Sequence, residues 1–123
     1  MVTLVSGNKY YALSHENNKI SLVQIYVSGN EITSEITEDL LWSYSDKKLS
    51  YESDNETYYL NVARSGGWFS SMTVGVSTSA SSNVTFSNNK IKVGSYYLSY
   101  SNGSVRTSSR SSSTTYLFKQ VEE

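Results

Sequence analysis

The chain has 123 residues, the size of one domain and enough for a hydrophobic core of its own. Its 10 basic and 11 acidic side chains leave a net charge of −1, so a broad electrostatic attraction to nucleic acid is not expected. Cysteine is absent, which excludes disulfides, a thiol nucleophile and cysteine-bound metals. We therefore expect one domain over residues 1–123, with no cofactor, no metal and no membrane insertion.

The composition predicts an all-β fold. Tyr, Val, Ile and Thr favour strands, whereas the abundant Ser and Asn favour turns. No window carries an uninterrupted helical spacing of apolar residues. Residues 32–39 are polar and predict an exposed excursion with room for a short helical turn. In chain order, the predicted strands outside the repeated stretches cover residues 2–5, 10–13, 20–27, 72–78, 97–100, 104–107 and 115–119.

One ten-residue stretch occurs twice in the chain. Residues 42–51, WSYSDKKLSY, return as residues 84–93, VTFSNNKIKV, with large apolar side chains at matching positions. A polar two-residue turn divides each copy, so each predicts a β-hairpin. A Tyr-Tyr doublet occurs three times, and we expect its first members to superpose about a threefold axis. These first members are Tyr10, Tyr58 and Tyr96.

The repeats predict three similar units, of which the first covers about 5–51, the second about 57–93, and the third begins at 96. The third unit lacks half of its hairpin. The start of the chain supplies this half if residues 2–5 pair with residues 115–119, and closing a sheet in this way removes exposed edges. This plan predicts a β-trefoil with three pseudo-repeats, and a β-sandwich is the alternative. The predicted core consists of Leu13, Leu60, Leu98, Trp42, Phe86, Leu49, Ile91 and Phe118.

Residues 40–62 contain the motif Leu-Leu-Trp-Ser-Tyr, then Leu-Ser-Tyr, then Tyr-Tyr-Leu-Asn-Val. This motif resembles one repeat of the ricin-B-like β-trefoil lectins. The sequence departs from the family at Leu40, where the family has Gln, and at Val84, which replaces the Trp in the second copy. The Asp with which those lectins orient sugar hydroxyls has no clear counterpart. The resemblance implies a trefoil fold and a sugar ligand.

We therefore expect a non-catalytic module that binds a glycan or a host glycoprotein and is part of a larger bacterial extracellular or cell-surface protein. The alternatives are a protein-interaction module, such as an adhesin or a protease-inhibitor-like trefoil, and a spacer domain without a ligand. The first residues contain no visible signal peptide, and the isolated domain is expected to be a monomer.

No residue pattern indicates catalysis. The one histidine, His15, lies in a polar segment and is expected to be exposed and without a partner. Glu35, Glu38 and Asp39 lie in the excursion, where solvation explains them. Nucleophile-elbow, phosphate-loop, zinc-protease and calcium-loop motifs are all absent from the sequence. The sequence therefore predicts that the protein is not an enzyme.

The adjacent aromatic residues Trp68 and Phe69 follow two glycines and give the strongest indication of a binding site. An exposed aromatic pair offers a large, rigid contact area, although the pair would equally plug one end of a barrel. Loops that follow the Tyr-Tyr strands of neighbouring units are expected to meet and to provide polar partners. The predicted ligand-binding residues are Arg64, Trp68, Phe69, Tyr100, Asn102 and Arg106.

Overall fold

The computed structural model describes residues 1–29, 31–64, 72–101, 103–108 and 114–117. Within these ranges the fold is all-β, as predicted, with 14 strands and no α-helix. Two single turns of 3-10 helix interrupt the strands, η1 at Glu16–Asn18 and η2 at Glu38–Leu40. No helix in the described part of the chain is long and apolar enough to span a membrane.

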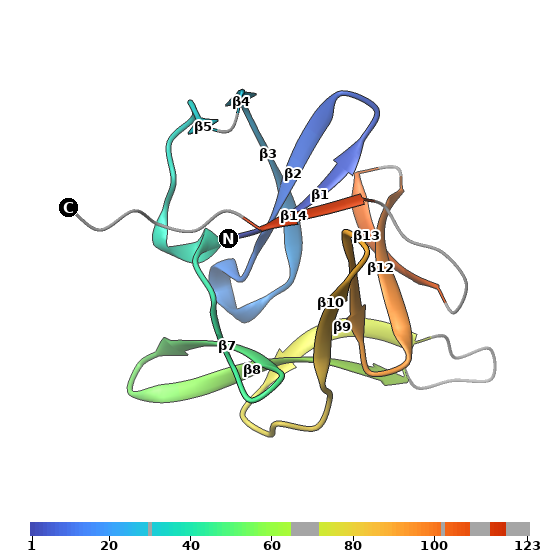
Figure 1. Ribbon diagram of the computed structural model, residues 1–123. Helices are drawn as coiled ribbons and strands as arrows, with labels where there is room; N and C mark the ends of the chain where they lie inside the picture. Colours follow the sequence, from blue (N-terminus) through green and yellow to red (C-terminus); the bar gives the residue numbers. More distant parts are fainter. Residues whose placement is uncertain (30, 65–71, 102, 109–113, 118–123) are drawn as a thin grey trace.

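Three four-stranded antiparallel sheets form most of the molecule (Figure 1). The first has the order β14-β1-β2-β3, formed by Thr114–Leu117, Val2–Ser6, Lys9–Ser14 and Ser21–Ile25. The second has the order β6-β7-β8-β9, formed by Ser43–Ser45, Lys48–Ser53, Glu56–Arg64 and Met72–Ser77. The third has the order β10-β11-β12-β13, formed by Val84–Ser87, Lys90–Val93, Tyr96–Ser101 and Ser104–Ser108. A small two-stranded sheet joins β4, Val27–Ser28, to β5, Glu31–Ile32.

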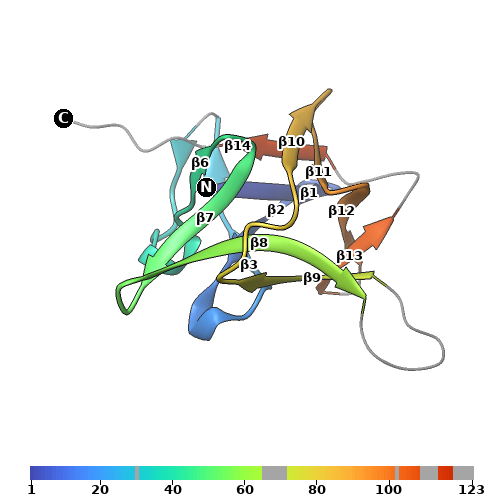
Figure 2. The same cartoon turned by 90° about the horizontal axis from the view of Figure 1, so that it is seen from below.

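The two ends of the chain pair with each other, as the sequence predicts. Strand β14 lies antiparallel to β1, in a register that runs from Val2 opposite Leu117 to Val5 opposite Thr114. Figure 2 shows the two strands side by side near the N-terminus. The last described strand therefore completes the sheet that the first strand begins.

The two copies of the repeated stretch form matching hairpins. Their two-residue turns, Asp46-Lys47 and Asn88-Asn89, both have positive φ at both positions. Such turns have a twist that fits the right-handed twist of the flanking strands. In addition, the Val84 backbone N–H donates to the Lys47 carbonyl oxygen over 2.6 Å, which ties the second hairpin to the first.

The core is built from three sets of side chains at matching positions of the three sheets. Each member is at most 6% exposed. The sets are Val2, Leu49 and Ile91; Leu4, Tyr51 and Val93; and Leu13, Leu60 and Leu98.

Most of the predicted core is confirmed, because Leu13, Leu49, Leu60, Ile91 and Leu98 are all buried. Trp42 and Phe86 are only half-buried and pack against this core from its edge. Both line an open groove, which explains why they keep contact with solvent. Phe118 lies outside the described residues.

The register corrects the expected match between the tyrosine doublets. Tyr58 pairs with the buried Tyr51, and Tyr96 pairs with the buried Val93. In the first sheet the residue opposite the buried Leu4 is Tyr11 rather than Tyr10. A slip of one residue exchanges the two faces of a strand, so the burial of the core fixes this register.

The predicted strand over residues 20–27 is interrupted after Ile25. Tyr26 turns outward with 63% of its surface exposed, and its backbone groups bond to Thr33 and Ser34 instead of continuing the sheet. The chain then leads to η2, the expected helical turn, where Leu40 is buried in a small second cluster with Ala12 and Ile25.

Candidate functional site

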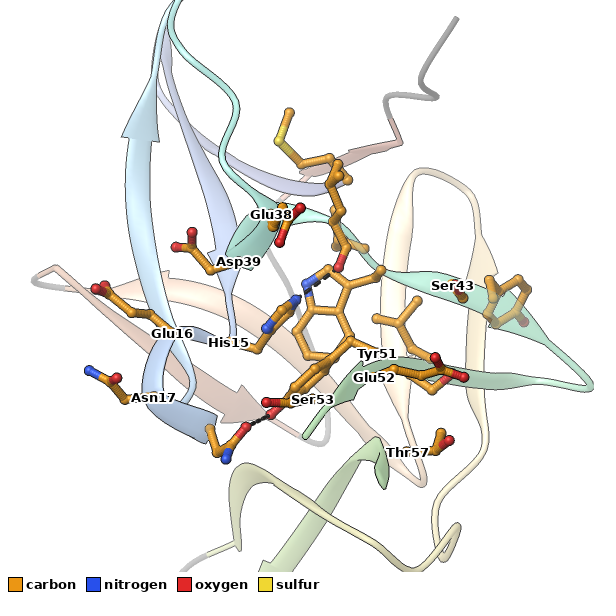
Figure 3. Close-up of a pocket in the computed structure, with 18 of the residues that line it drawn as sticks. His15, Glu16, Asn17, Glu38, Asp39, Ser43, Tyr51, Glu52, Ser53 and Thr57 are labelled. Carbon is orange, nitrogen blue, oxygen red and sulfur yellow. Dashed lines mark hydrogen bonds between the residues drawn. The ribbon is translucent and has the colours of Figure 1, made fainter. Parts of the chain in front are cut away.

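An open groove of about 1280 Å³ lies between the first sheet and the second sheet. Figure 3 shows it in close-up, with His15 and Tyr51 near its centre. Its walls come from η1, η2, β6, β7 and the segments that join them. The lining residues are Met1, Val2, His15, Glu16, Asn17, Asn18, Glu38, Asp39, Leu41, Trp42, Ser43, Tyr44, Leu49, Ser50, Tyr51, Glu52, Ser53, Asp54, Thr57 and Phe86.

His15 is half-buried and has partners on every side, so the expectation of an exposed, unpartnered histidine is wrong. Its Nε2–H donates to the Leu41 carbonyl oxygen over 2.9 Å. Its backbone N–H donates to the Asp39 carbonyl oxygen, also over 2.9 Å. Its ring stacks on Tyr51 with centroids 3.6 Å apart and planes within 5°. The polar sequence around His15 gave no sign of these contacts, because η2 returns to cover it from more than twenty residues away.

Trp42 stands edge-on to both of these rings. Its ring centroid lies 4.9 Å from that of His15 and 5.3 Å from that of Tyr51, and both interplanar angles are near 90°. The indole Nε1–H donates to the Leu13 carbonyl oxygen over 3.0 Å. On the other side, Tyr58 stacks on Tyr51 at 5.4 Å. We call His15, Trp42, Tyr51 and Tyr58 the aromatic cluster, and its contacts fix every ring from at least one side.

Tyr51 connects the aromatic cluster to the polar rim of the groove. The side chain is only 6% exposed, and its burial raises the pKa of the phenol, so that the group stays protonated. Its hydroxyl donates to Asn18 Oδ1 over 2.7 Å. Asn18 itself is exposed at the end of η1, with a positive φ of 57°. The buried ring therefore holds an exposed amide in one orientation.

Tyr44 is the most exposed large apolar side chain of the groove, with 48% of its surface accessible. Its hydroxyl donates to the Val84 carbonyl oxygen. Its ring meets Phe86 edge to face, with centroids 5.1 Å apart. A ring that is held by its hydroxyl and by one edge, yet keeps much of its surface open, is a preorganised stacking surface.

The charged side chains that line the groove are all acidic. Figure 3 shows Glu16, Glu38 and Asp39 on one side of His15 and Glu52 on the other. The carboxylates of the lining belong to Glu16, Glu38, Asp39, Glu52 and Asp54, and no described Lys or Arg belongs to it. The groove therefore offers many acceptors and disfavours an anionic ligand.

Asp39 is held in its charged form. A hydrogen bond from the Thr37 hydroxyl is the largest cause that lowers the pKa of this carboxyl, and burial opposes it. Ser14 Oγ also donates to Asp39 Oδ2, over 3.1 Å. These bonds favour the carboxylate at neutral pH and fix η2 against the end of β2.

Three members of the aromatic cluster, His15, Trp42 and Tyr51, occupy positions that are aliphatic at the next junction between sheets. Tyr51 matches the buried Val93, and Trp42 matches Val84 by the register of the two hairpins. His15 follows the buried Leu13 by two residues, as Val62 follows Leu60. Three core-like positions thus carry His, Trp and Tyr at the groove, and Val at the junction between the second sheet and the third.

The site predicted from the sequence lies elsewhere and is described only in part. Trp68, Phe69 and Asn102 lie outside the described residues. Arg64 is the last residue of β8, and Arg106 is exposed on β13.

Tyr100 is half-buried on β12, where it stacks on Tyr11 with ring centroids 4.1 Å apart. The contact joins the third sheet to the first. Strands β9 and β13, which follow the two loops of the predicted site, lie in contact with each other. A ligand site at these loops stays a prediction.

No residue of the groove was predicted from the sequence to bind a ligand. The sequence did contain one indication of the site. When the two copies of the repeat are aligned, Tyr51 matches Val93 and Trp42 matches Val84. A buried Tyr or Trp requires a partner for its polar atom, whereas Val does not. Such a replacement within a repeated core marks a place where the core meets polar groups.

Comparison with protein-family models, with curated proteins and with solved structures finds no match to this chain. Within the described ranges, no three His, Asp or Glu side chains are grouped so that they could hold a metal ion. The function is therefore inferred from the chemistry of the groove.

Proposed function

We propose that the chain is a non-catalytic β-trefoil module that binds neutral glycans in the groove, as part of an extracellular or cell-surface protein. The observation that carries this proposal is Tyr44, an open ring fixed by its neighbours beside a groove lined with hydrogen-bonding groups. A sugar has an apolar C–H face and a rim of hydroxyls. It fits a site that combines a flat ring with several polar groups.

The trefoil part of the proposal is supported by the pairing of β1 with β14 and by the matching hairpins. It is also supported by the nine core positions, because each of the three four-stranded sheets contributes three of them at matching places. A β-sandwich core would require two facing sheets and gives no reason for this threefold repetition.

The ligand class follows from the lining. Carboxylates accept hydrogen bonds from sugar hydroxyls, and charge-assisted bonds of this kind are among the stronger ones. With five carboxylates and no Lys or Arg side chain in the described lining, the groove disfavours the negative charge of a uronic acid or a sulfated sugar. Neutral sugars are therefore expected to bind and acidic sugars are not.

The experiment is calorimetric titration with three hexasaccharides: the N-acetylglucosamine hexamer, cellohexaose and the galacturonic acid hexamer. We expect at least one neutral hexamer to bind and to remain intact, and the acidic hexamer not to bind. Tyr44→Ala should weaken binding by about 0.5–1.5 kcal/mol, the usual contribution of an aromatic contact.

Tyr26→Ala is the matched control, because Tyr26 is also an exposed tyrosine but does not line the groove. It should leave the affinity unchanged. Failure of both neutral hexamers to bind the parent protein, or equal affinities for the two variants, would contradict the proposal.

A further inference from the structure

The carboxamide of Asn18 is oriented by the protein and not by a ligand. Its Oδ1 accepts the hydrogen bond from Tyr51, and among the described residues none accepts a hydrogen bond from its Nδ2. A carboxamide is planar, so anchoring its oxygen also restricts the direction of the two N–H donors. Asn18 lines the groove and is exposed, so these donors are available to a bound molecule.

The group that orients Asn18 is itself fixed. The Tyr51 ring lies between His15, at 3.6 Å, and Tyr58, at 5.4 Å, and Trp42 meets it edge-on. The matching residues of the other two sheets, Leu4 and Val93, have no hydroxyl to offer. Of the three matching positions, only the one at the groove can therefore hold an amide in this way.

Asn17 and Asn18 both bring carboxamide donors to the lining, and of these two only Asn18 has its carboxamide oxygen held by a hydrogen bond. The five carboxylates only accept hydrogen bonds, and the Ser and Thr hydroxyls can either donate or accept. A sugar hydroxyl can donate to any of these carboxylates. A carbonyl oxygen can only accept, so it is unfavourable beside carboxylates and favourable beside a fixed N–H.

We infer that Asn18 Nδ2 donates to the acetamido carbonyl of an N-acetylated sugar, and that Tyr51 positions it for this purpose. The inference rests on the glycan-binding function proposed above and makes N-acetylhexosamines the preferred ligands of the groove. Asn18 contacts the ligand, whereas Tyr51 acts through Asn18.

The test compares the dissociation constants of the N-acetylglucosamine hexamer and of cellohexaose, which lacks the acetamido group, for the parent protein and three variants. The parent should bind the N-acetylated hexamer more tightly by about 3- to 10-fold, the effect of one additional hydrogen bond. Asn18→Asp keeps an acceptor for the Tyr51 hydroxyl but removes the N–H donors, so it should abolish this preference. Tyr51→Phe keeps the ring and releases the amide, so it should reduce the preference without abolishing binding.

Asn89→Asp is the matched control. Asn89 is also exposed and has a φ of 59°, close to the 57° of Asn18, but it does not line the groove. The substitution adds the same charge in the same backbone conformation, and it should leave both affinities unchanged.

A second readout is the side-chain NH₂ resonance of Asn18 in ¹H–¹⁵N spectra. It should shift on addition of the N-acetylated hexamer and much less with cellohexaose, which a purely structural Asn18 would not do. If the parent binds both hexamers equally, or if Asn18→Asp keeps the preference, the role of Asn18 is wrong while the glycan-binding function stands. If neither hexamer binds the parent, both the role and the function are wrong.

Discussion

Two junctions between sheets use the same positions for different purposes. The junction of the second and third sheets carries Val62, Val84 and Val93, which belong to the hydrophobic core or pack against it. The space is filled there, because a Cβ added to Gly94 would lie 3.2 Å from Val62 Cγ2. The backbone N–H of Val62 is satisfied by Ser82 Oγ over 3.1 Å.

The junction of the first and second sheets carries His15, Trp42 and Tyr51 instead. These rings donate hydrogen bonds to nearby groups: His15 Nε2 and Trp42 Nε1 donate to the carbonyls of Leu41 and Leu13, and the Tyr51 hydroxyl donates to Asn18. The scaffold thus accommodates polar aromatic side chains at core positions where other segments supply hydrogen-bond partners. One junction serves stability, and the other combines stability with an open groove.

The largest expected effect comes from a core position that supports both junctions. Leu60 is fully buried between the second sheet and the rest of the core. Leu60→Ala should lower the free energy of unfolding by about 2–5 kcal/mol, because it removes buried methyl groups and leaves a cavity. Denaturant unfolding measures this, and a loss below about 0.5 kcal/mol, the range of ordinary surface substitutions, would contradict the core assignment.

A smaller effect is expected when the aromatic residue is transferred to the valine junction. Val93→Tyr places a large ring and a hydroxyl at a fully buried site that matches Tyr51. Val93 is fully buried in the hydrophobic core, so the larger ring should overpack this site and cost about 1–3 kcal/mol.

Thermal and denaturant unfolding of this variant measure the cost. If Val93→Tyr is as stable as the parent, the valine junction accepts a tyrosine as readily as the groove junction does, and the proposed difference between the two junctions is wrong.

The sequence predicted the parts of the fold that local pattern determines. The hairpins at residues 42–51 and 84–93 follow from alternation and turn residues, and the buried leucines follow from their recurrence. The pairing of the chain ends was predicted because the third unit lacked a partner strand. The tyrosine doublets were matched one residue out of register, since a sequence repeat alone does not say which ring faces the core.

The groove could not be predicted in the same way. His15 is separated by a long stretch of chain from Trp42 and Tyr51, which belong to one hairpin, and η2 brings His15 and Trp42 together. A binding site was predicted at Trp68 and Phe69 instead, because two adjacent aromatic residues can be recognised from a short stretch of sequence. A site assembled from distant segments is indicated only indirectly in the sequence, for example by a Tyr in one copy of the repeat where the other copy has Val.

The smallest expected effect is a pH dependence that belongs to the groove junction alone. The Asp39 carboxyl has a pKa below its ordinary value of 3.8, chiefly because the Thr37 hydroxyl donates to it. The charged form is thus favoured in the folded state, and its contribution is present above this ordinary value and is lost as the pH falls through the folded pKa. Asp39→Asn should therefore cost less than about 1 kcal/mol at neutral pH and almost nothing at about pH 2.

Ser82→Ala is the counterpart at the valine junction. Ser82 is buried and neutral, and its hydroxyl oxygen accepts from the Val62 N–H. Its loss should cost the same at both pH values. Unfolding of both variants at the two pH values measures this, and an equal pH dependence would contradict the assignment of the Asp39 contacts.

We expect the groove, and not the loops around Trp68 and Arg106, to bind the glycan. The most direct measurement is a ¹H–¹⁵N titration of the parent protein with the N-acetylglucosamine hexamer. Binding in the groove should shift the resonances of Asn18, Tyr44 and Glu52 most and leave Val62 unaffected. Shifts concentrated at Trp68, Phe69 and Arg106, or no shifts at all, would contradict it.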